Sequence, residues 1–471
     1  MGNLNNTAKS NSDKKSKDLV FYCSSAASML SRKAVDEFEI YGLSSVSNSI
    51  EIFNLNVENL SFSDTRGLGF RVFKNGRIGY AYTSNLEELE IEKCIEKAVA
   101  NSTVTSKENY NYLPQESEFK YKKNLVDRKY LFSEKFIEYS IEDKIRLAKH
   151  LEIITKKRDK RVKGINNLIY EDNLAEVAII NSAGFCDSYK TSSAFIYESV
   201  VSRDGDDNST GDYFGYERDP EKLDIELISE NAVNRSLVML GAKKIKSQVI
   251  NVLLDPFVAA QFLGVIAGIL TADAVQKGKS LFKGRIGDKI FNKDFNIIDD
   301  GTLKEGLSSK PFDGEGVPKG RTIIFEKGVL RTYLYNTFTA RKDNTLSTGN
   351  AVRSSYKSPP ETGISNFYIE PSTLSFDDLI REMDRGFYVM DIIGLHSGVN
   401  PVSGHISVGA KGLWIENGII SFPLKEVTIA TDILSFCKNL EKVGSDLKYL
   451  PAGGYIGSPS MLVSNVTVSG N

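Results

Sequence analysis

The mostly apolar run PFVAAQFLGVIAGIL, at residues 256–270, is the segment from which the fold of the C-terminal half can be predicted. Asp255 in front of it is a suitable N-cap and Pro256 suits the first helical position, so we expect a helix to begin here and to enter a buried site. Gly264 and Gly268 lie four residues apart in it, and each costs about 1 kcal/mol relative to alanine in a helix interior. Their spacing favours close packing against another helix, and close approach of a bound chain is the alternative.

Strand signals outnumber helix signals on both sides of this run, and the two do not alternate regularly. Asn75-Gly76 between alternating apolar residues predicts a tight hairpin. The apolar periodicity predicts helices at 19–34, 87–101, 133–157 and 221–240, and strands at 37–41, 49–54, 59–64, 67–73, 78–83, 162–170, 174–181, 185–189 and 194–203. These elements favour an α+β fold with N-terminal strand/helix repeats followed by a large strand-rich C-terminal domain.

Length and element order divide the 471 residues into a tail and three blocks. The tail is rich in Asn, Ser and Lys, a composition typical of disorder. The predicted divisions are a disordered tail at 1–18, an N-terminal domain at 19–125, a central domain at 126–245 and a C-terminal domain at 246–471.

Charge and composition argue against several classes of function. Hydrophobic residues make up 41% and charged residues 25% of the chain, which is typical of a soluble globular protein. The net charge of −2 gives no electrostatic reason to expect nucleic acid as a partner. The apolar, uncharged run 256–272 is shorter than the roughly 20 residues of a membrane-spanning helix, so no membrane partner is expected. Four cysteines without a C-x-x-C pair indicate a protein of the reducing cytoplasm.

The histidines argue against a metal site in this chain. There are three, His150, His396 and His405, whereas a catalytic zinc usually takes three protein ligands from His, Cys, Asp and Glu. No two of them have the spacing that places two imidazoles on one face of a helix. His396 and His405 could meet only if the Gly/Pro/Ser-rich segment between them folds back. We therefore expect His396 and His405 to be polar loop residues or partly buried, hydrogen-bonded histidines, and His150 to be a surface residue of a helix.

Several short motifs follow the apolar run in a fixed order. They are KGKSLF at 277–282, GRIG at 284–287, LSSKPFDGEGV at 307–317, YNTFTARK at 335–342 and WIENG at 414–418. In these motifs the chain resembles the TldD/PmbA family, and the resemblance covers nearly its whole length. That family was once labelled as modulators of DNA gyrase and is regarded as a two-subunit metallopeptidase.

The resemblance also assigns positions to the family's zinc motif. In catalytic members the helix carries His-Glu, three residues and then His, and counting back from KGKSLF matches these to Leu263, Gly264 and Gly268. Catalytic members take a third ligand from a cysteine in a Gly-rich C-terminal segment, and the matching segment, 449–459, has none. The resemblance therefore implies the PmbA/TldE-like subunit, with no cofactor in this chain and with zinc in a TldD-like partner.

A second implication concerns a groove for substrate. Residues 400–412 resemble the family's strand beside the active-site cleft, where an extended peptide can be received through backbone hydrogen bonds. On this basis we expect Ser403, Gly404, His405 and Ser407 to line a substrate groove. The alternative is an ordinary Gly/Ser-rich strand inside the fold.

The leading hypothesis is a PmbA/TldE-like subunit of a cytoplasmic metallopeptidase that degrades or processes unfolded peptides. Such a chain would support a TldD-like catalytic subunit in a heterodimer, or form a homodimer. Whether it is itself an enzyme stays open. One alternative is a metal-independent hydrolase that uses Asp255, Asp273 or Glu315. The other is a non-catalytic regulatory binding protein, in line with the gyrase label.

Overall fold

The computed structural model describes residues 18–119 and 126–470. The expected disordered tail lies outside these residues except for Asp18, which is the N-cap of the first helix. The described residues are 26% helix and 41% strand, with both mixed along the chain. The predicted α+β fold with a strand-rich C-terminal region is therefore confirmed.

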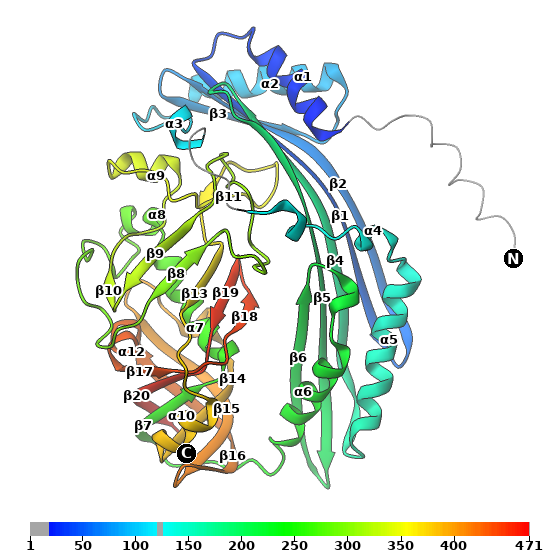
Figure 1. Cartoon of the computed structure of the whole chain (residues 1–471), viewed down its shortest axis with the longest axis vertical. Helices are drawn as coiled ribbons and strands as arrows, with labels where there is room; N and C mark the ends of the chain where they lie inside the picture. Colours follow the sequence, from blue (N-terminus) through cyan, green and yellow to red (C-terminus); the bar gives the residue numbers. More distant parts are fainter. Residues whose placement is uncertain (1–17, 120–125, 471) are drawn as a thin grey trace, which may run out of the picture.

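The N-terminal half is built on one long, curved antiparallel sheet with strand order β3-β2-β1-β4-β5-β6 (Figure 1). Its strands are β1 (Glu37–Phe53), β2 (Asn56–Lys74), β3 (Arg77–Thr83), β4 (Val162–Asn181), β5 (Cys186–Asp204) and β6 (Asp207–Glu217). β1 pairs with β4, and Tyr41 lies opposite Ile179. The two blocks that precede residue 246 therefore share a single sheet.

These strands are longer than the sequence predicts. The expected pairs 37–41 and 49–54, and 59–64 and 67–73, are each one continuous strand, because the ladder between β1 and β2 runs on through polar residues such as Ser45, which lies opposite Thr65. Backbone hydrogen bonds do not depend on the side chains that interrupt an apolar pattern. The Asn75-Gly76 hairpin is confirmed, since both residues have positive φ, at 52° and 75°.

Helices cover this sheet at both ends. The N-terminal half contains α1 (Leu19–Leu30), α2 (Glu88–Val104), α3 (Glu116–Phe119), α4 (Lys135–Glu138), α5 (Ile141–Arg158) and α6 (Ile225–Leu237), with single 3-10 turns at Arg128–Tyr130 and Pro220–Lys222. α1 and α2 form one apolar core with the end of the sheet near β1 to β3, and α5 and α6 form another with β4 to β6. The helix expected at 133–157 is divided between α4 and α5, because Ser140 caps a new helix with Asp143.

The C-terminal half contains two further six-stranded sheets. One has the order β16-β15-β14-β7-β20-β17 and closes on itself, because β16 also pairs with β20. Its strands are β7 (Gln248–Leu254), β14 (Gly386–Ile393), β15 (His405–Glu416), β16 (Ile419–Asp432), β17 (Leu440–Val443) and β20 (Met461–Ser469). The other has the order β10-β9-β8-β13-β19-β18, with β8 (Ile297–Asp300), β9 (Arg321–Glu326), β10 (Val329–Leu330), β13 (Asn366–Ile369), β18 (Lys448–Pro451) and β19 (Tyr455–Ser458).

The expected apolar helix is α7 (Pro256–Ile269), and it contacts strands of both C-terminal sheets. Asp255 caps it by accepting a hydrogen bond from the backbone N–H of Phe257 at 3.0 Å. Its buried residues belong to the largest apolar core of the molecule. The remaining elements are α8 (Ala272–Gln276), α9 (Thr337–Lys342), α10 (Phe376–Met383), α11 (Leu395–Gly398), α12 (Ile433–Asn439) and the short hairpin of β11 (Ala351–Val352) and β12 (Glu361–Thr362).

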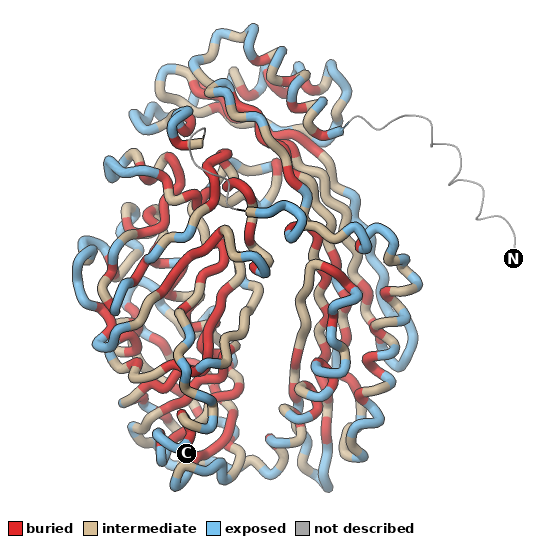
Figure 2. The backbone as a smooth tube through the Cα atoms, viewed as in Figure 1, coloured by how far each residue is buried: buried red, intermediate tan, exposed pale blue. Residues whose placement is uncertain are grey.

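The two halves lie side by side along their length, and one part of the contact between them lies at the end of the molecule where α3, β3 and β11 lie (Figure 1). Phe312 packs there against Phe185 and Tyr189 of the N-terminal sheet, with ring centroids 5.0 Å apart in both pairs. Buried backbone runs through both halves, while exposed residues gather in the loops and on the outer helices (Figure 2). None of the helices within the described ranges is long and apolar enough to cross a membrane.

Candidate functional site

A cavity of about 510 Å³ lies against α7, and we call it the α7 cavity. Gly264 and Gly268 line it from the helix, and Leu450, Ala452 and Gly453 line it from the C-terminal segment. The structure therefore brings together the two segments that the resemblance assigns to the zinc site. The remaining lining residues are Gln261, Val265, Ala267, Thr271, Thr362, Gly363, Ile364, Leu395 and Ile456.

The two glycines leave this face of α7 without side chains. A Cβ atom at Gly268 would meet nothing within 4 Å, and one at Gly264 would meet only the Cδ1 atom of Ile456, at 3.0 Å. Leu263, which matches the first histidine of the motif, is 1% exposed and belongs to the apolar core instead. The space beside α7 therefore depends on Gly264 and Gly268, which are one helical turn apart.

The donor groups in the α7 cavity do not fit a catalytic zinc. Its polar side chains are the amide of Gln261 and the hydroxyls of Thr271 and Thr362, and no His, Cys, Asp or Glu lines it. Within residues 18–119 and 126–470, no three His, Cys, Asp or Glu side chains come together in a way that could hold a metal. The three histidines, His150, His396 and His405, are all exposed.

The predicted groove residues lie at the start of β15. Ser403 and His405 are exposed, Ser407 is half-buried, and Gly404 is buried with a φ of +81°. A Cβ atom at Gly404 would lie 2.7 Å from the Cδ1 atom of Leu281, so this turn requires glycine. None of the four lines the α7 cavity or the two cavities described next. Their role in a groove stays a prediction.

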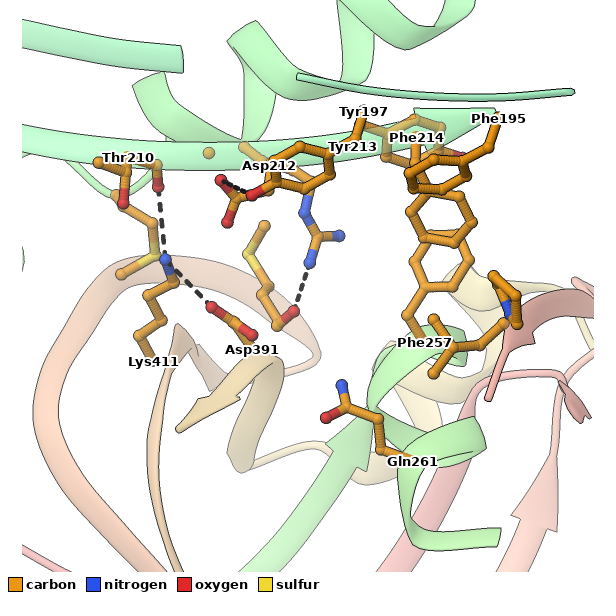
Figure 3. A pocket seen from close by; sticks show the side chains of 16 residues that line it. Phe195, Tyr197, Thr210, Asp212, Tyr213, Phe214, Phe257, Gln261, Asp391 and Lys411 are labelled. Carbon is orange, nitrogen blue, oxygen red and sulfur yellow. Dashed lines mark hydrogen bonds and ion pairs between the residues drawn. The ribbon is translucent and has the colours of Figure 1, made fainter. Parts of the chain in front are cut away.

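A second cavity, of about 350 Å³, lies between the two halves of the molecule, and we call it the interface cavity. Figure 3 shows Phe257 and Gln261 on α7 facing the aromatic side chains of the N-terminal sheet. The rings of Phe214 and Phe257 have centroids 4.9 Å apart. The residues that line this cavity are Phe195, Tyr197, Thr210, Gly211, Asp212, Tyr213, Phe214, Arg235, Met239, Phe257, Gln261, Met390, Asp391, Lys411, Leu450 and Pro451.

Each charged group of the interface cavity has a partner. Lys411 Nζ lies 3.2 Å from a carboxylate oxygen of Asp391, and the Tyr197 hydroxyl donates to Asp212 at 3.1 Å (Figure 3). Arg235 pairs with Asp255 at 3.0 Å. An apolar, aromatic wall with few polar groups is typical of a binding cavity.

A third cavity, of about 270 Å³, is polar, and we call it the lysine cavity. Its lining residues are Tyr41, Tyr189, Ser308, Lys310, Asp313, Gly314, Lys319, Ala351, Val352, Arg353, Ile364, Gly453 and Gly454. It shares Ile364 and Gly453 with the α7 cavity, which in turn shares Gln261 and Leu450 with the interface cavity. The three cavities therefore adjoin one another in a row past α7.

Burial shifts the ionisation of the charged groups around the lysine cavity. It lowers the pKa of Lys310 to about 8, and the charges of Lys319 and Arg218 act in the same direction. Burial also raises the pKa of Asp313 to about 7, helped by the charge of Glu315. Burial acts to raise the pKa of Glu315, but the charge of Arg71 and the hydrogen bonds from Thr337 and Arg71 together outweigh it, so this pKa is lowered. Clusters of shifted groups in a cavity are typical of functional sites.

The three acids proposed for a metal-independent hydrolase have different structural partners. Asp255 caps α7 and pairs with Arg235. Asp273 is half-buried and forms a helical pair with Lys277 at 2.8 Å. Glu315 is buried and accepts hydrogen bonds from Arg71 and from the backbone N–H of Thr337, both at 2.8 Å. Each acid is thus accounted for by a local structural role.

Sequence reasoning did not single out the lysine cavity or the aromatic wall of the interface cavity. Lys310 and Asp313 fall inside the LSSKPFDGEGV motif, which served there only as a family marker. Lys310 and Lys319 lie nine residues apart and flank a segment rich in small and turn residues. This pattern is the one feature of that segment that could have indicated a cationic site. Phe195, Tyr213 and Phe214 lie on strands whose alternation predicts burial but not a cavity.

Three family models match the chain in order. They are the PmbA/TldA metallopeptidase domain 1 at residues 38–102, the central domain at 134–240 and the C-terminal domain at 247–470. Together they cover most of the chain.

The chain belongs to the PmbA/TldD family. Relatives in this family include the protein named metalloprotease PmbA homolog of Buchnera aphidicola, which is 26% identical over 94% of this chain and 95% of its own length. The metalloprotease PmbA homolog of Haemophilus influenzae is 28% identical over 88% of each chain.

Solved structures of the PmbA/TldD family have the same fold. A crystal structure from Thermotoga maritima, named as a candidate modulator of a DNA gyrase, is 28% identical with a TM-score of 0.85, and the match covers 95% of this chain and 99% of that one. TldE from Thermococcus kodakarensis has a TM-score of 0.84 at 21% identity, over 95% of this chain and 99% of its own. The second likeness concerns the fold alone.

Proposed function

We propose that this chain is the non-catalytic, PmbA/TldE-like subunit of a two-chain metallopeptidase that degrades or processes unfolded peptides. The bare face of α7 carries the proposal. Gly264 and Gly268 stand there at positions where the resemblance places the glutamate and the second histidine of the zinc motif, and the cavity beside them has only amide and hydroxyl donors. Zinc and the chemistry of peptide-bond hydrolysis would belong to a TldD-like partner.

The relatives favour the PmbA type of subunit over the TldD type, but relatives of both types are similar to this chain. The Buchnera and Haemophilus proteins are named as PmbA homologues. A protein named metalloprotease TldD homolog, also from Buchnera, is 25% identical over 94% of this chain. Both kinds of subunit thus share the fold, and the missing ligand side chains separate them.

The row of cavities suggests what this chain contributes to the assembly. β18 is an edge strand of its sheet, and Leu450 on it lines both the interface and the α7 cavities. An extended peptide adds to such an edge through backbone hydrogen bonds and places alternate side chains in neighbouring cavities. A folded domain does not fit cavities of about 350 and 510 Å³, so the row favours unfolded chains.

The assembly and its location are part of the same proposal. We expect a heterodimer with a TldD-like chain, with a homodimer of this chain as the alternative state. All four cysteines are free, and three of them are buried. This suits a reducing compartment such as the cytoplasm.

The proposal is tested by purifying this chain alone and together with a TldD-like partner. Zinc content is measured by atomic emission, and cleavage of unfolded casein is followed with and without a chelator. We expect the isolated chain to hold less than about one tenth of an equivalent of zinc and to be inactive. The complex should hold zinc and show chelator-sensitive cleavage.

The opposite result is equally clear. Stoichiometric zinc and chelator-sensitive cleavage by the isolated chain would refute the non-catalytic assignment. A stable chain that forms no complex with any TldD-like protein would instead favour the regulatory alternative.

A further inference from the structure

The ammonium group of Lys310 is a cation without an anionic partner. Lys310 is partly buried in the wall of the lysine cavity. Among residues 18–119 and 126–470, no side chain or carbonyl lies within ion-pair or hydrogen-bond distance of its Nζ atom. Burying a charge without a partner is costly, so a retained lysine here points to an anion that is not part of the chain.

The other cations around this cavity already have partners. Lys319 donates to the hydroxyl of Ser365 at 2.7 Å, and Arg353 pairs with Glu39. Arg218 donates to backbone carbonyls, including that of Leu307 at 2.8 Å. None of these interactions compensates the charge of Lys310.

The acid that lines this cavity is engaged as well. Asp313 accepts backbone N–H groups from Glu315 at 2.8 Å and from Val317 and Ala351 at 3.0 Å. The carboxylate of Asp313 therefore fixes the loop that carries it rather than pairing with Lys310. Within the described residues, Lys319 and Arg218 have hydrogen-bond partners, whereas the ammonium group of Lys310 has neither a hydrogen bond nor an ion pair. An anionic group in the cavity would supply both.

Two hydroxyl groups add to this cationic wall. Tyr41 and Tyr189 line the same cavity, and in the described part of the chain neither hydroxyl has a hydrogen-bond partner. A planar carboxylate can accept from an ammonium and from hydroxyl groups at the same time. A dianion such as phosphate would bring a second negative charge close to the carboxylate of Asp313, which lines the same cavity.

The lysine cavity also lies at the end of the row of cavities past α7. It shares Ile364 and Gly453 with the α7 cavity. Gly453 has a φ of +64°, and a Cβ atom built on it would meet nothing within 4 Å, so no side chain blocks this junction. A chain lying along α7 would therefore reach Lys310 with one of its ends.

We propose that the lysine cavity binds the C-terminal carboxylate of a peptide, with Lys310 as its counter-ion and Tyr41 and Tyr189 as additional donors. The inference rests on the proposed function in that the ligand is an extended peptide. It goes further because it states which end of the peptide this subunit recognises and therefore in which direction the peptide lies along α7.

The test compares two probes on the full-length chain, alone and in complex with a TldD-like partner. Both probes are penta-alanine with an N-terminal fluorescein; one has a free C-terminal carboxylate and the other a C-terminal amide. The protein is titrated into each probe at pH 7, and binding is followed by fluorescence anisotropy. We expect the acid to bind about tenfold more tightly than the amide. Lys310→Met should reduce this preference to about twofold or less, and Lys310→Arg should retain most of it.

Controls separate the site from general charge effects. Lys283→Met removes an exposed lysine elsewhere and should leave the preference unchanged. Tyr189→Phe keeps the ring that packs on Phe312 and should lower the preference about two- to fivefold. Inorganic phosphate at millimolar concentration should compete weakly with the acid.

Each outcome bears on one of the two proposals. Equal binding of acid and amide, or a preference that survives Lys310→Met, overturns the carboxylate site while leaving peptide binding intact. Phosphate that displaces the acid far better than free acetate does also overturns it in favour of a phosphate site. Binding of neither peptide, alone or in the complex, overturns peptide recognition by this chain altogether.

Discussion

Glu198, on β5 of the N-terminal sheet, is a fully buried carboxyl without an ion pair among the residues described. Its Oε2 atom accepts a hydrogen bond from the hydroxyl of Thr155 at 2.8 Å, while Oε1 has no partner in the described structure. Burial raises the pKa of Glu198 to about 8 against the lowering effect of Thr155. The group is therefore largely protonated in the folded protein at neutral pH.

Glu198 makes the stability of the fold depend on pH. Because its pKa is raised on folding, the folded protein keeps a proton that the unfolded chain releases above about pH 4.5. The contribution to stability is complete below that pH and is lost as the pH rises through about 8. Glu198→Gln should raise the free energy of unfolding by about 1–3 kcal/mol at pH 8.5 and change it little at pH 5, measured by urea denaturation.

Glu58→Gln on the exposed part of β2 is the matched control and should give the same small effect at both pH values. A Glu198→Gln protein that is less stable than the parent at pH 8.5 would show that the carboxylate is ionised and paired in the folded state.

Among the elements, α7 contains two glycines that lower its stability as a helix and leave open the cavity beside it. Gly268 has room for a side chain, whereas a Cβ atom at Gly264 would approach Ile456 to 3.0 Å. Gly268→Ala should therefore raise the free energy of unfolding by about 0.5–1 kcal/mol, and Gly264→Ala should gain less. Denaturant titration of the two variants checks this. A loss of stability in Gly268→Ala would mean that the cavity is closed in solution.

A larger side chain at the same position tests what the space is for. Gly268→Phe places a ring in the α7 cavity, because Gly268 lines this cavity and a Cβ atom there would meet nothing within 4 Å. We expect penta-alanine amide to bind at least about tenfold more weakly, with little change in the free energy of unfolding. Anisotropy and denaturation on the same protein measure both quantities. Unchanged binding would place the peptide elsewhere.

The elements that could be predicted from the sequence are those with local signals. Asp255 and Pro256 mark the start of α7, and Asn75-Gly76 marks the hairpin between β2 and β3. Both could be predicted because capping and positive φ are set by neighbouring residues. The full length of β1 could not be predicted. Its polar middle is held by the ladders to β2 and β4, and those partners are distant in the sequence.

The same distinction applies to the site. Gly264 and Gly268 lie on one helix, so a family motif was enough to single them out. The lysine cavity joins Tyr41 of β1, Lys310 and Gly453, which are hundreds of residues apart in the chain. Such a site is formed only by tertiary structure, so it could not be predicted from the spacing of residues in the sequence.

At the scale of the whole molecule, a buried network of charges joins the two halves. Arg71 on β2 donates to Glu39 on β1 and to Glu315 of the C-terminal half, both at 2.8 Å. Arg353, also from the C-terminal half, pairs with the other oxygen of Glu39. All four side chains are at most 6% exposed. The network therefore fixes how the N-terminal sheet sits against the cavities.

Removing one member of this network should be costly. Arg71→Met leaves Glu315 without its cation and Glu39 with one of two, so we expect a loss of about 3–5 kcal/mol in the free energy of unfolding. Limited proteolysis should also become faster at the contact between the halves. Arg128→Met removes an exposed pair with Asp187 and should cost less than about 1 kcal/mol. A comparable, small loss in both variants would contradict the role given to Arg71.

The pairing of β1 with β4 has a consequence for how the protein is made. Thirteen residues of β1, from Glu39 to Glu51, lie opposite β4, which leaves the ribosome more than a hundred residues later. Until then the nascent chain carries a long open strand, which is a template for pairing with other chains. A gene truncated before β4 should accordingly yield inclusion bodies, and chaperone demand during translation should peak in that interval.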